Sequence, residues 1–165
     1  MEMKQLTARD AAALDALIAV IEEMLPNEAF WLPLDKVAHD HFFDPAWTEF
    51  WGMFDGDRLV AASALFFNEY EYGDTLALLG GALTGVAEIG RCMVHPDYRG
   101  NGLMYRLNCH LAEVARDRGY ACLLATVHPD NLPSRRTFEK MGFENKLSCI
   151  KHGTYPREVY LLPLK

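Results

Sequence analysis

The sequence of 165 residues predicts an α/β fold with a mixed, mostly antiparallel sheet, a parallel central pair of strands and flanking helices. Strand-like and helix-like runs follow one another in the order β-α-α-β-β-β-α-β-α-β-β. The turn "DGD" at residues 55–57 joins two strand-like runs and predicts an antiparallel hairpin. The motif "VHPD" occurs at residues 94–97 and again at 127–130, each time where a strand gives way to a helix. Two such strands predict a parallel neighbouring pair whose following helices begin at the same edge of the sheet.

The first half of the chain is predicted to contain one long helix and the hairpin. Thr7 and Asp10 form the pattern of a capping box, which marks the start of a helix. Apolar residues then recur at helical spacing until Pro26, which ends the helix. The expected elements are strands at residues 3–7, 48–54 and 58–67, a helix at 8–25, and a short helix with loops in the aromatic-rich segment 30–54.

The second half is predicted to alternate strands and helices and to end in two strands. Four glycines between residues 68 and 85 predict a loop around a short apolar run at 75–79. One helix ends before Gly119 and another at Gly142, since glycine is common just after a helix. The expected elements are strands at residues 86–94, 121–127, 147–150 and 159–164, a helix after residue 102, and a helix between residues 128 and 142.

Composition indicates a compact protein, for which we expect one domain over residues 1–165. Hydrophobic residues make up 50% of the chain and charged residues 24%, as in ordinary globular domains. No apolar run approaches the roughly 18–20 residues of a membrane span, and the N-terminus lacks the layout of a signal peptide. A cytoplasmic protein without a membrane partner is therefore expected. The four cysteines contain no C-x-x-C pair and are interpreted as reduced packing residues.

The net charge of −7 argues against a nucleic-acid partner, because the average field repels phosphates. The segment from Glu22 to Phe50 carries seven acidic residues and one basic residue, Lys36. An anionic ligand should therefore bind elsewhere.

The stretch "RGNG" from Arg99 to Gly102 stands where a helix should begin. A helix N-terminus has unpaired N–H groups and a partial positive charge, so it binds phosphate when nothing covers it. Gly100 and Gly102 remove Cβ atoms that would block the approach, and Arg99 adds a positive charge. The alternative is a glycine turn that only starts a helix. A P-loop pattern is absent, and Tyr105 stands where a Rossmann fingerprint needs its third glycine.

With Arg99 included, the stretch resembles the (R/Q)-x-x-G-x-(G/A) motif of the GNAT superfamily of acyl-CoA-dependent N-acyltransferases. The surrounding sequence also resembles the superfamily. The stretch "VHPDYRGNG" is followed by an expected helix, an expected strand, Asn131 and then "FEKMGF", which is similar to the superfamily's "YEKLGF". The resemblance is strong over residues 86–145. It implies a GNAT-like fold in which the parallel central pair is splayed, and a single GNAT-like acetyltransferase domain over residues 1–165.

The resemblance also implies that acetyl-CoA is the co-substrate and lies in a V-shaped gap between the strands ending at Val94 and Val127. Asn131 and Ser134 would face its pantetheine arm; the alternative for both is helix capping alone. The pyrophosphate would meet the amides of Arg99, Gly100, Asn101, Gly102, Leu103 and Met104, and the pantetheine arm the backbone of Cys92, Met93 and Val94.

Glu88 is the candidate general base. It lies in the strand before the motif and four residues before Cys92, a spacing that resembles that of the catalytic glutamate of histone-type members. The alternative is a solvated glutamate on the outer face of the strand. Gly90 can mark a β-bulge that splays the two strands, or it is an ordinary strand glycine.

The sequence departs from the family pattern at two positions. Met104 stands where the family prefers Gly or Ala, which crowds the first helical turn. Phe138 stands where many members have the tyrosine that protonates the departing thiolate, so Tyr155, Tyr160 or water is left to supply that proton.

No metal site is expected. His39 and His41 lie in the acidic segment without a third spaced ligand. His95 and His128 recur in "VHPD" and are interpreted as turn residues rather than catalytic ones.

These observations favour an N-acetyltransferase that transfers an acetyl group from acetyl-CoA to a primary amine of a small molecule or peptide, by direct attack. The acidic segment would attract a cationic acceptor if it lies at the acceptor mouth; otherwise its acids are a solvated face and its aromatics are core. The alternatives are a non-catalytic coenzyme A-binding or sensing module and a simple interaction domain. A homodimer is one assembly compatible with these properties.

Overall fold

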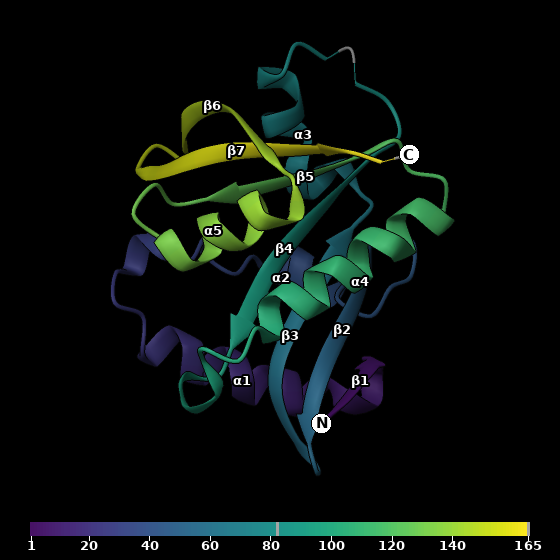
Figure 1. Cartoon of the computed structure of the whole chain (residues 1–165), viewed down its shortest axis with the longest axis vertical. Coiled ribbons are helices and arrows are strands. Elements are labelled where there is room, and N and C mark those ends of the chain that lie inside the picture. Colours follow the sequence, from purple (N-terminus) through teal and green to yellow (C-terminus); the bar gives the residue numbers. More distant parts are fainter. Residues whose placement is uncertain (82, 165) are drawn as a thin grey trace.

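The computed structural model describes residues 1–81 and 83–164, and in these residues seven strands form one sheet in the order β1-β2-β3-β4-β5-β7-β6 (Figure 1). The strands are β1 (Glu2–Gln5), β2 (Thr48–Asp55), β3 (Arg58–Phe66), β4 (Val86–Val94), β5 (Cys122–Val127), β6 (Glu144–Lys151) and β7 (Tyr155–Pro163). The α-helices are α1 (Ala11–Glu23), α2 (Lys36–Asp40), α3 (Glu69–Leu78), α4 (Leu103–Asp117) and α5 (Leu132–Met141). Short 3-10 helices cover Ala8–Asp10, Glu28–Phe30 and Pro96–Tyr98.

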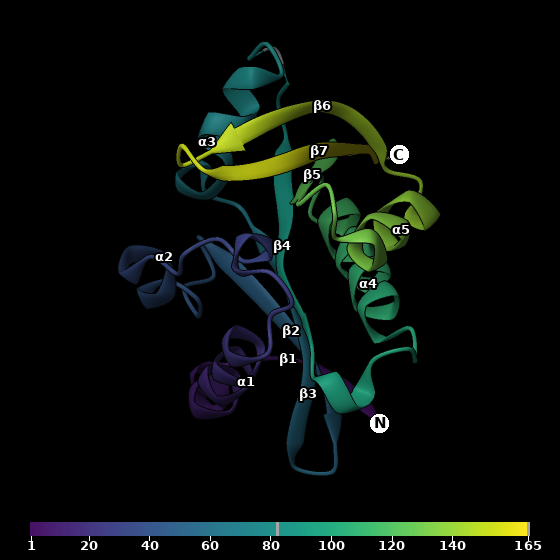
Figure 2. The same cartoon turned by 90° about the vertical axis from the view of Figure 1, so that its left-hand side faces the viewer.

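The pairing of β4 with β5 at the centre of the sheet sets the architecture. These two strands are parallel, whereas all the other neighbouring pairs are antiparallel. The parallel ladder covers only Val86–Glu88 opposite Cys122–Leu124 and then stops. Beyond it the two strands run apart, which opens the sheet in the middle (Figure 2). The predicted α/β class, with a mostly antiparallel sheet and a parallel central pair, is therefore confirmed.

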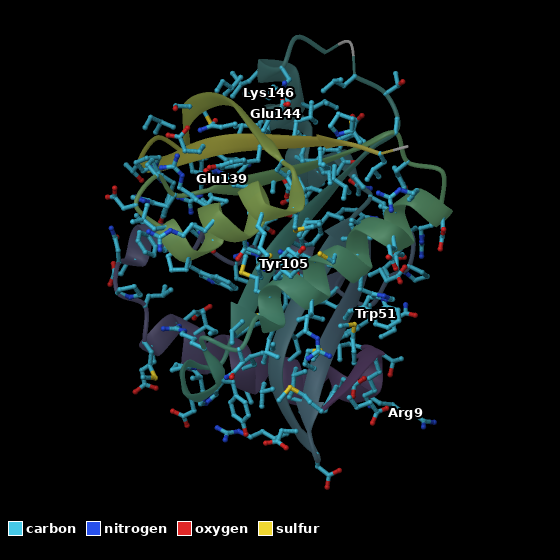
Figure 3. The ribbon with its side chains drawn as sticks, in the orientation of Figure 1. Arg9, Trp51, Tyr105, Glu139, Glu144 and Lys146 are labelled. Carbon is cyan, nitrogen blue, oxygen red and sulfur yellow. The ribbon has the colours of Figure 1, made fainter. Side chains whose placement is uncertain are left out.

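The helices cover both faces of the sheet. Figure 2 shows α4 and α5 on one face and α1 and α2 on the other. α4 buries Leu107, Leu111 and Ala115, which recur every four residues and so lie on one side of the helix. Lys140 Nζ of α5 lies 4.1 Å from the centre of the Tyr105 ring, so the two helices also contact each other. Figure 3 shows Tyr105 on α4.

The capping box predicted at the start of the first helix is present. The N–H of Thr7 donates to Asp10 Oδ2 at 2.9 Å, and the Thr7 hydroxyl accepts from the N–H of Arg9 at 3.3 Å. Residues 8–10 form a 3-10 turn that continues directly into α1.

The loop predicted over residues 68–85 is wrong, because α3 occupies Glu69–Leu78. Asn68 caps this helix by accepting from the N–H of Tyr70 at 2.9 Å, and Tyr72 anchors it by donating its hydroxyl to the carbonyl of Val86 at 2.8 Å. Gly73 has a low helix propensity and disfavours a helix here. The hydrogen bond from the buried Tyr72 to β4 outweighs this local preference.

The last two strands are longer than predicted. β6 and β7 begin three and four residues earlier than the apolar runs at 147–150 and 159–164. Their polar first residues are held by cross-strand pairing, which a search for apolar runs does not detect.

Candidate active site

A cavity of about 650 Å³ lies where β4 and β5 separate. On the face that carries α4 and α5 it is lined by Met104, Asn131, Ser134 and Phe138. On the opposite face it is lined by residues of the segment before α2, of α3, and of the end of the β6–β7 hairpin. The cavity therefore has walls from both faces of the sheet, and Glu88 lies between them.

The carboxyl group of Glu88 lines this cavity and is almost completely buried, with 7% of the residue exposed. Within the described residues its Oε2 atom has no hydrogen-bond partner. Burial raises its pKa to about 8; the nearby Lys151 partly opposes this rise, whereas Glu71 adds to it. The carboxyl group can therefore gain and lose a proton near neutral pH, as a general base must.

A β-bulge follows Glu88 along β4. Ala64 pairs with Gly90 and Ala62 with Met93, so the residues between them on β4 outnumber those on β3 by one. Arg91 has a φ of +50°, a left-handed conformation that is rare outside glycine. A Cβ at Gly90 would lie 2.9 Å from the ring of Phe66, so the strand requires glycine there. The bulge expected at Gly90 is thus found one residue further on.

Cys92, at the end of this bulge, is a packing and lining residue. Its thiol lies 3.2 Å from the Ser63 hydroxyl, which in turn donates to the side chain of Asn108 at 2.7 Å. Burial raises the pKa of the Cys92 thiol to about 11, so it stays protonated at neutral pH. This thiol is therefore a poor acyl carrier, which favours direct attack by the acceptor.

The N-terminus of α4 is open. Gly100 and Gly102 have φ values of +81° and +69°, and a Cβ at either would meet no atom of the described residues within 4 Å. Among these residues no side chain caps the helix. The side chain of Asn101 instead donates to the carbonyl of Tyr98 at 3.0 Å and fixes the turn. The glycines are thus needed for the left-handed turn, and the space above the first N–H groups is left for a ligand.

The other predicted cofactor residues differ in how they lie relative to the cavity. Cys92, Met104, Asn131 and Ser134 line the cavity, whereas the side chains of Met93 and Leu103 are core, so only their backbone can meet a ligand. Val94 is half-buried and Arg99 is exposed. Asn131 also accepts from the N–H of Ser134 at 3.5 Å, so it caps α5 and faces the cavity at once.

Neither tyrosine expected to serve as the general acid lines the cavity. Tyr160 is fully buried, and its hydroxyl is held between Arg135 at 3.0 Å and Glu139 at 2.9 Å. Tyr155 lies at the start of β7, outside the cavity lining. Tyr70 of α3 lines the cavity instead, and sequence reasoning missed it because α3 was taken for a loop.

The acidic segment does not line the cavity mouth as expected. Of its seven acidic residues only Asp35 is among the lining residues, where it accepts from the Tyr70 hydroxyl at 2.6 Å. This hydrogen bond lowers the pKa of Asp35. Glu49 is buried in an ion pair with Arg118, and Asp40 pairs with Lys36. A cationic acceptor attracted by the whole segment is therefore not supported.

The two "VHPD" histidines have the turn role that was predicted. His95 Nδ1 accepts from the N–H of Asp97 at 3.1 Å, and His128 Nδ1 from that of Asp130 at 3.0 Å.

His39 pairs with Asp15 at 2.8 Å. Within residues 1–81 and 83–164 no group of three or more His, Cys, Asp or Glu side chains could hold a metal ion. The described helices include none long and apolar enough to cross a membrane.

Comparison with known proteins identifies the fold. Residues 14–143 match the model of the acetyltransferase (GNAT) family. The structure of a ribosomal-protein-S18-alanine N-acetyltransferase from Escherichia coli superposes with a TM-score of 0.73 at 16% identity, covering 99% of this chain and 94% of the other. A ribosomal-protein-alanine N-acetyltransferase from Brucella melitensis gives 0.73 at 20% identity, covering 99% and 100%. A probable acetyltransferase from Staphylococcus epidermidis gives 0.76 at 14% identity, covering 99% of each chain.

No curated protein matches the sequence. The family model covers both the place where β4 and β5 separate and the glycine turn before α4. The chain belongs to the acetyltransferase (GNAT) family.

Proposed function

We propose that this protein is a cytoplasmic, single-domain N-acetyltransferase that transfers the acetyl group of acetyl-CoA to a primary amine of a small molecule or peptide. The observation that carries the proposal is the buried Glu88 carboxyl with its unpartnered oxygen, at the point where the sheet opens. A glutamate kept uncharged by burial in a cavity is an unusual structural element, and such groups cluster at functional sites.

The residues around the gap fit acetyl-CoA. The uncapped N-terminus of α4 and the turn from Arg99 to Gly102 leave open space suited to a pyrophosphate. The pantetheine arm would follow the backbone from Cys92 to Val94, with Asn131 and Ser134 opposite it. When bound, acetyl-CoA supplies an activated acyl group and a good leaving group, since an ordinary thiol has a pKa of about 8.5.

Glu88 would remove the proton from the acceptor amine, directly or through a water. The amine nitrogen then forms the bond to the acetyl carbon, and the carbon–sulfur bond breaks with its electron pair on sulfur. Phe138 cannot donate a proton, and the thiol leaves tolerably well unassisted, so a missing general acid lowers the rate by at most about 10² to 10⁴.

Replacing Glu88 tests this proposal. Glu88→Gln should lower kcat by about 10² to 10⁴ and leave the Kd of acetyl-CoA nearly unchanged, because the lost group acts on the amine proton. In the wild type, kcat/KM should rise with pH and level off above about pH 8, the pKa of Glu88, and this break should vanish in the variant. The measurements are steady-state release of coenzyme A over pH 6–10 and calorimetric titration with acetyl-CoA.

Glu113→Gln, which changes an exposed glutamate on α4, is the matched control and should behave as wild type. An inert Glu88→Gln change would remove Glu88 from the reaction. Binding of acetyl-CoA without acetylation of any amine would support the alternative function, a coenzyme A-binding or sensing module.

A further inference from the structure

Three cationic side chains line the cavity on the face opposite α4 and α5: Arg91, Lys151 and Arg157. Two of them have partners in the protein. Arg91 donates to the carbonyls of residues 32 and 33 at 2.8 and 3.2 Å, and Lys151 lies 3.5 Å from Asp74. Arg91 also lies 4.8 Å above the ring of Trp31. These two cations therefore hold the cavity walls in place.

Arg157 is different, because it is 2% exposed and has no carboxylate within 4.0 Å among the described residues. A guanidinium has five N–H donors, and among the described residues this one donates only to the carbonyl of Pro156, at 2.7 Å. Its central carbon also lies 5.9 Å from the centre of the Tyr155 ring. The neighbouring Glu158 is bound to Ser148 at 2.6 Å and to Asn145 at 3.0 Å. A buried cation without a counter-ion is costly, so the fold maintains a charge that a ligand can compensate.

Burial lowers the pKa of Arg157 to about 10, and the positive charge of Arg91 contributes to this. At neutral pH the guanidinium stays charged, so the cavity lining carries Arg157 as a cation in addition to Arg91 and Lys151. The same lining contains an unsatisfied donor, because the indole N–H of Trp31 is buried without an acceptor among the described residues. The unpaired charge of Arg157 favours an anion in this part of the cavity, and the Trp31 N–H needs a hydrogen-bond acceptor.

The charge balance of the lining limits what that anion can be. Asp35, Glu71 and Asp74 also line the cavity and balance its three cations, while Glu88 is mostly uncharged at pH 7. A multiply charged anion such as a phosphate ester would be repelled by these acids. A zwitterion fits, because its ammonium group can face the carboxylates and its single negative charge can face the guanidinium of Arg157.

We infer that Arg157 binds a carboxylate of the acceptor, and hence that the acceptors are amines of the amino acid class. This inference rests on the proposed acetyl transfer and names its substrate class. A guanidinium binds a carboxylate through two parallel hydrogen bonds, which orients the amine as well as holding it. Aromatic and apolar residues of the same lining, Phe30, Trp31 and Phe66, provide space for an apolar side chain.

The test uses pairs of acceptors that differ only in the carboxylate: L-phenylalanine with phenethylamine, and L-leucine with 3-methylbutylamine. The full-length wild type should acetylate the amino acid of each pair with a kcat/KM at least about 10² times that of the amine. Arg157→Gln should raise KM for the amino acid about 10²-fold, with little change in kcat and little change for the amine, so that the preference collapses. Arg157→Lys, which keeps the charge, should retain part of the preference.

Arg116→Gln, which changes an exposed arginine at the end of α4, is the matched control. Circular dichroism and the Kd of acetyl-CoA establish that each variant is folded. If the amines are acetylated as well as the amino acids, or if Arg157→Gln impairs both equally, the inference is overturned while acetyl transfer stands. If neither kind of acceptor is acetylated although acetyl-CoA binds, the inference is overturned. The proposed function fails as well only if a wider panel of small-molecule and peptide amines is also left unmodified.

Discussion

Replacing Glu88 by glutamine should stabilise the protein, and increasingly so as the pH rises. The carboxyl group is 7% exposed, and burial raises its pKa from 4.5 to about 8. The native state therefore keeps a proton that the unfolded state releases above pH 4.5. The protonated Glu88 makes its full contribution to the free energy of unfolding below pH 4.5. This contribution falls as the pH rises and is lost once the pH passes about 8.

The size of the effect follows from the pKa difference. Each pKa unit corresponds to about 1.4 kcal/mol, so a rise from 4.5 to about 8 costs the wild type about 5 kcal/mol at alkaline pH. At pH 7 the cost is about 3 kcal/mol, a large share of the roughly 5–15 kcal/mol typical of a domain. Glutamine has nearly the same shape and never ionises, so the variant escapes this cost.

The assay is urea unfolding of the ligand-free protein at pH 5, 7 and 9, followed by the fluorescence of its three tryptophans. The difference in free energy of unfolding between Glu88→Gln and wild type should be small at pH 5 and grow by several kcal/mol by pH 9. Glu113→Gln should show no such growth. A constant difference across this range would mean that Glu88 titrates like a solvated glutamate, and the argument for its role as a base would lose its electrostatic support.

Two further predictions concern coenzyme A and the missing general acid. Gly102→Glu should weaken acetyl-CoA binding about 10²-fold or more in calorimetric titration, because it places a negative charge where the pyrophosphate would lie. Gly102→Gln adds the same bulk without the charge and should weaken binding much less. Equal losses of affinity in the two variants would show that the bulk of the side chain, and not its charge, opposes binding. Phe138→Tyr changes a residue that lines the cavity and should leave the fold intact. In this variant kcat/KM should fall again near pH 10, where tyrosine ionises and can no longer donate a proton. An unchanged dependence of kcat/KM on pH would show that the new hydroxyl does not reach the leaving sulfur.

The features that sequence analysis predicted correctly depend on short segments. The turn from Arg99 to Gly102 needs glycines for its left-handed residues, and helix α4 starts directly after it. The place of Glu88 in the strand before this turn was also predicted, whereas the sequence left open whether its side chain faces solvent. Both features depend on residues that lie within about ten positions of one another, so the local sequence is enough to predict them.

The features that were missed depend on contacts between distant segments. α3 contains Gly73, which disfavours a helix, and it is fixed by the hydrogen bond from the Tyr72 hydroxyl to the carbonyl of Val86 on β4. Arg157 lay outside the predicted strand, because the run of apolar residues starts later. Its side chain reaches the cavity because β7 pairs with β5 on one side and β6 on the other, and this order is not visible in the local pattern.

The short parallel ladder between β4 and β5 has a mechanical consequence. Among the described residues, the ladder that joins strands β1 to β4 to strands β5, β7 and β6 has three residue pairs, fewer than any other ladder of the sheet. The N–H of Ala121 extends it by donating to the carbonyl of Gly85 at 2.7 Å. Arg91 and Arg157 belong to different halves. A small rotation of one half against the other would change the width of the cavity while the strand pairing within each half stays intact. Mutations that change the angle between the two halves of the sheet can therefore change which acceptors fit the cavity, even when the mutated residue does not contact the acceptor.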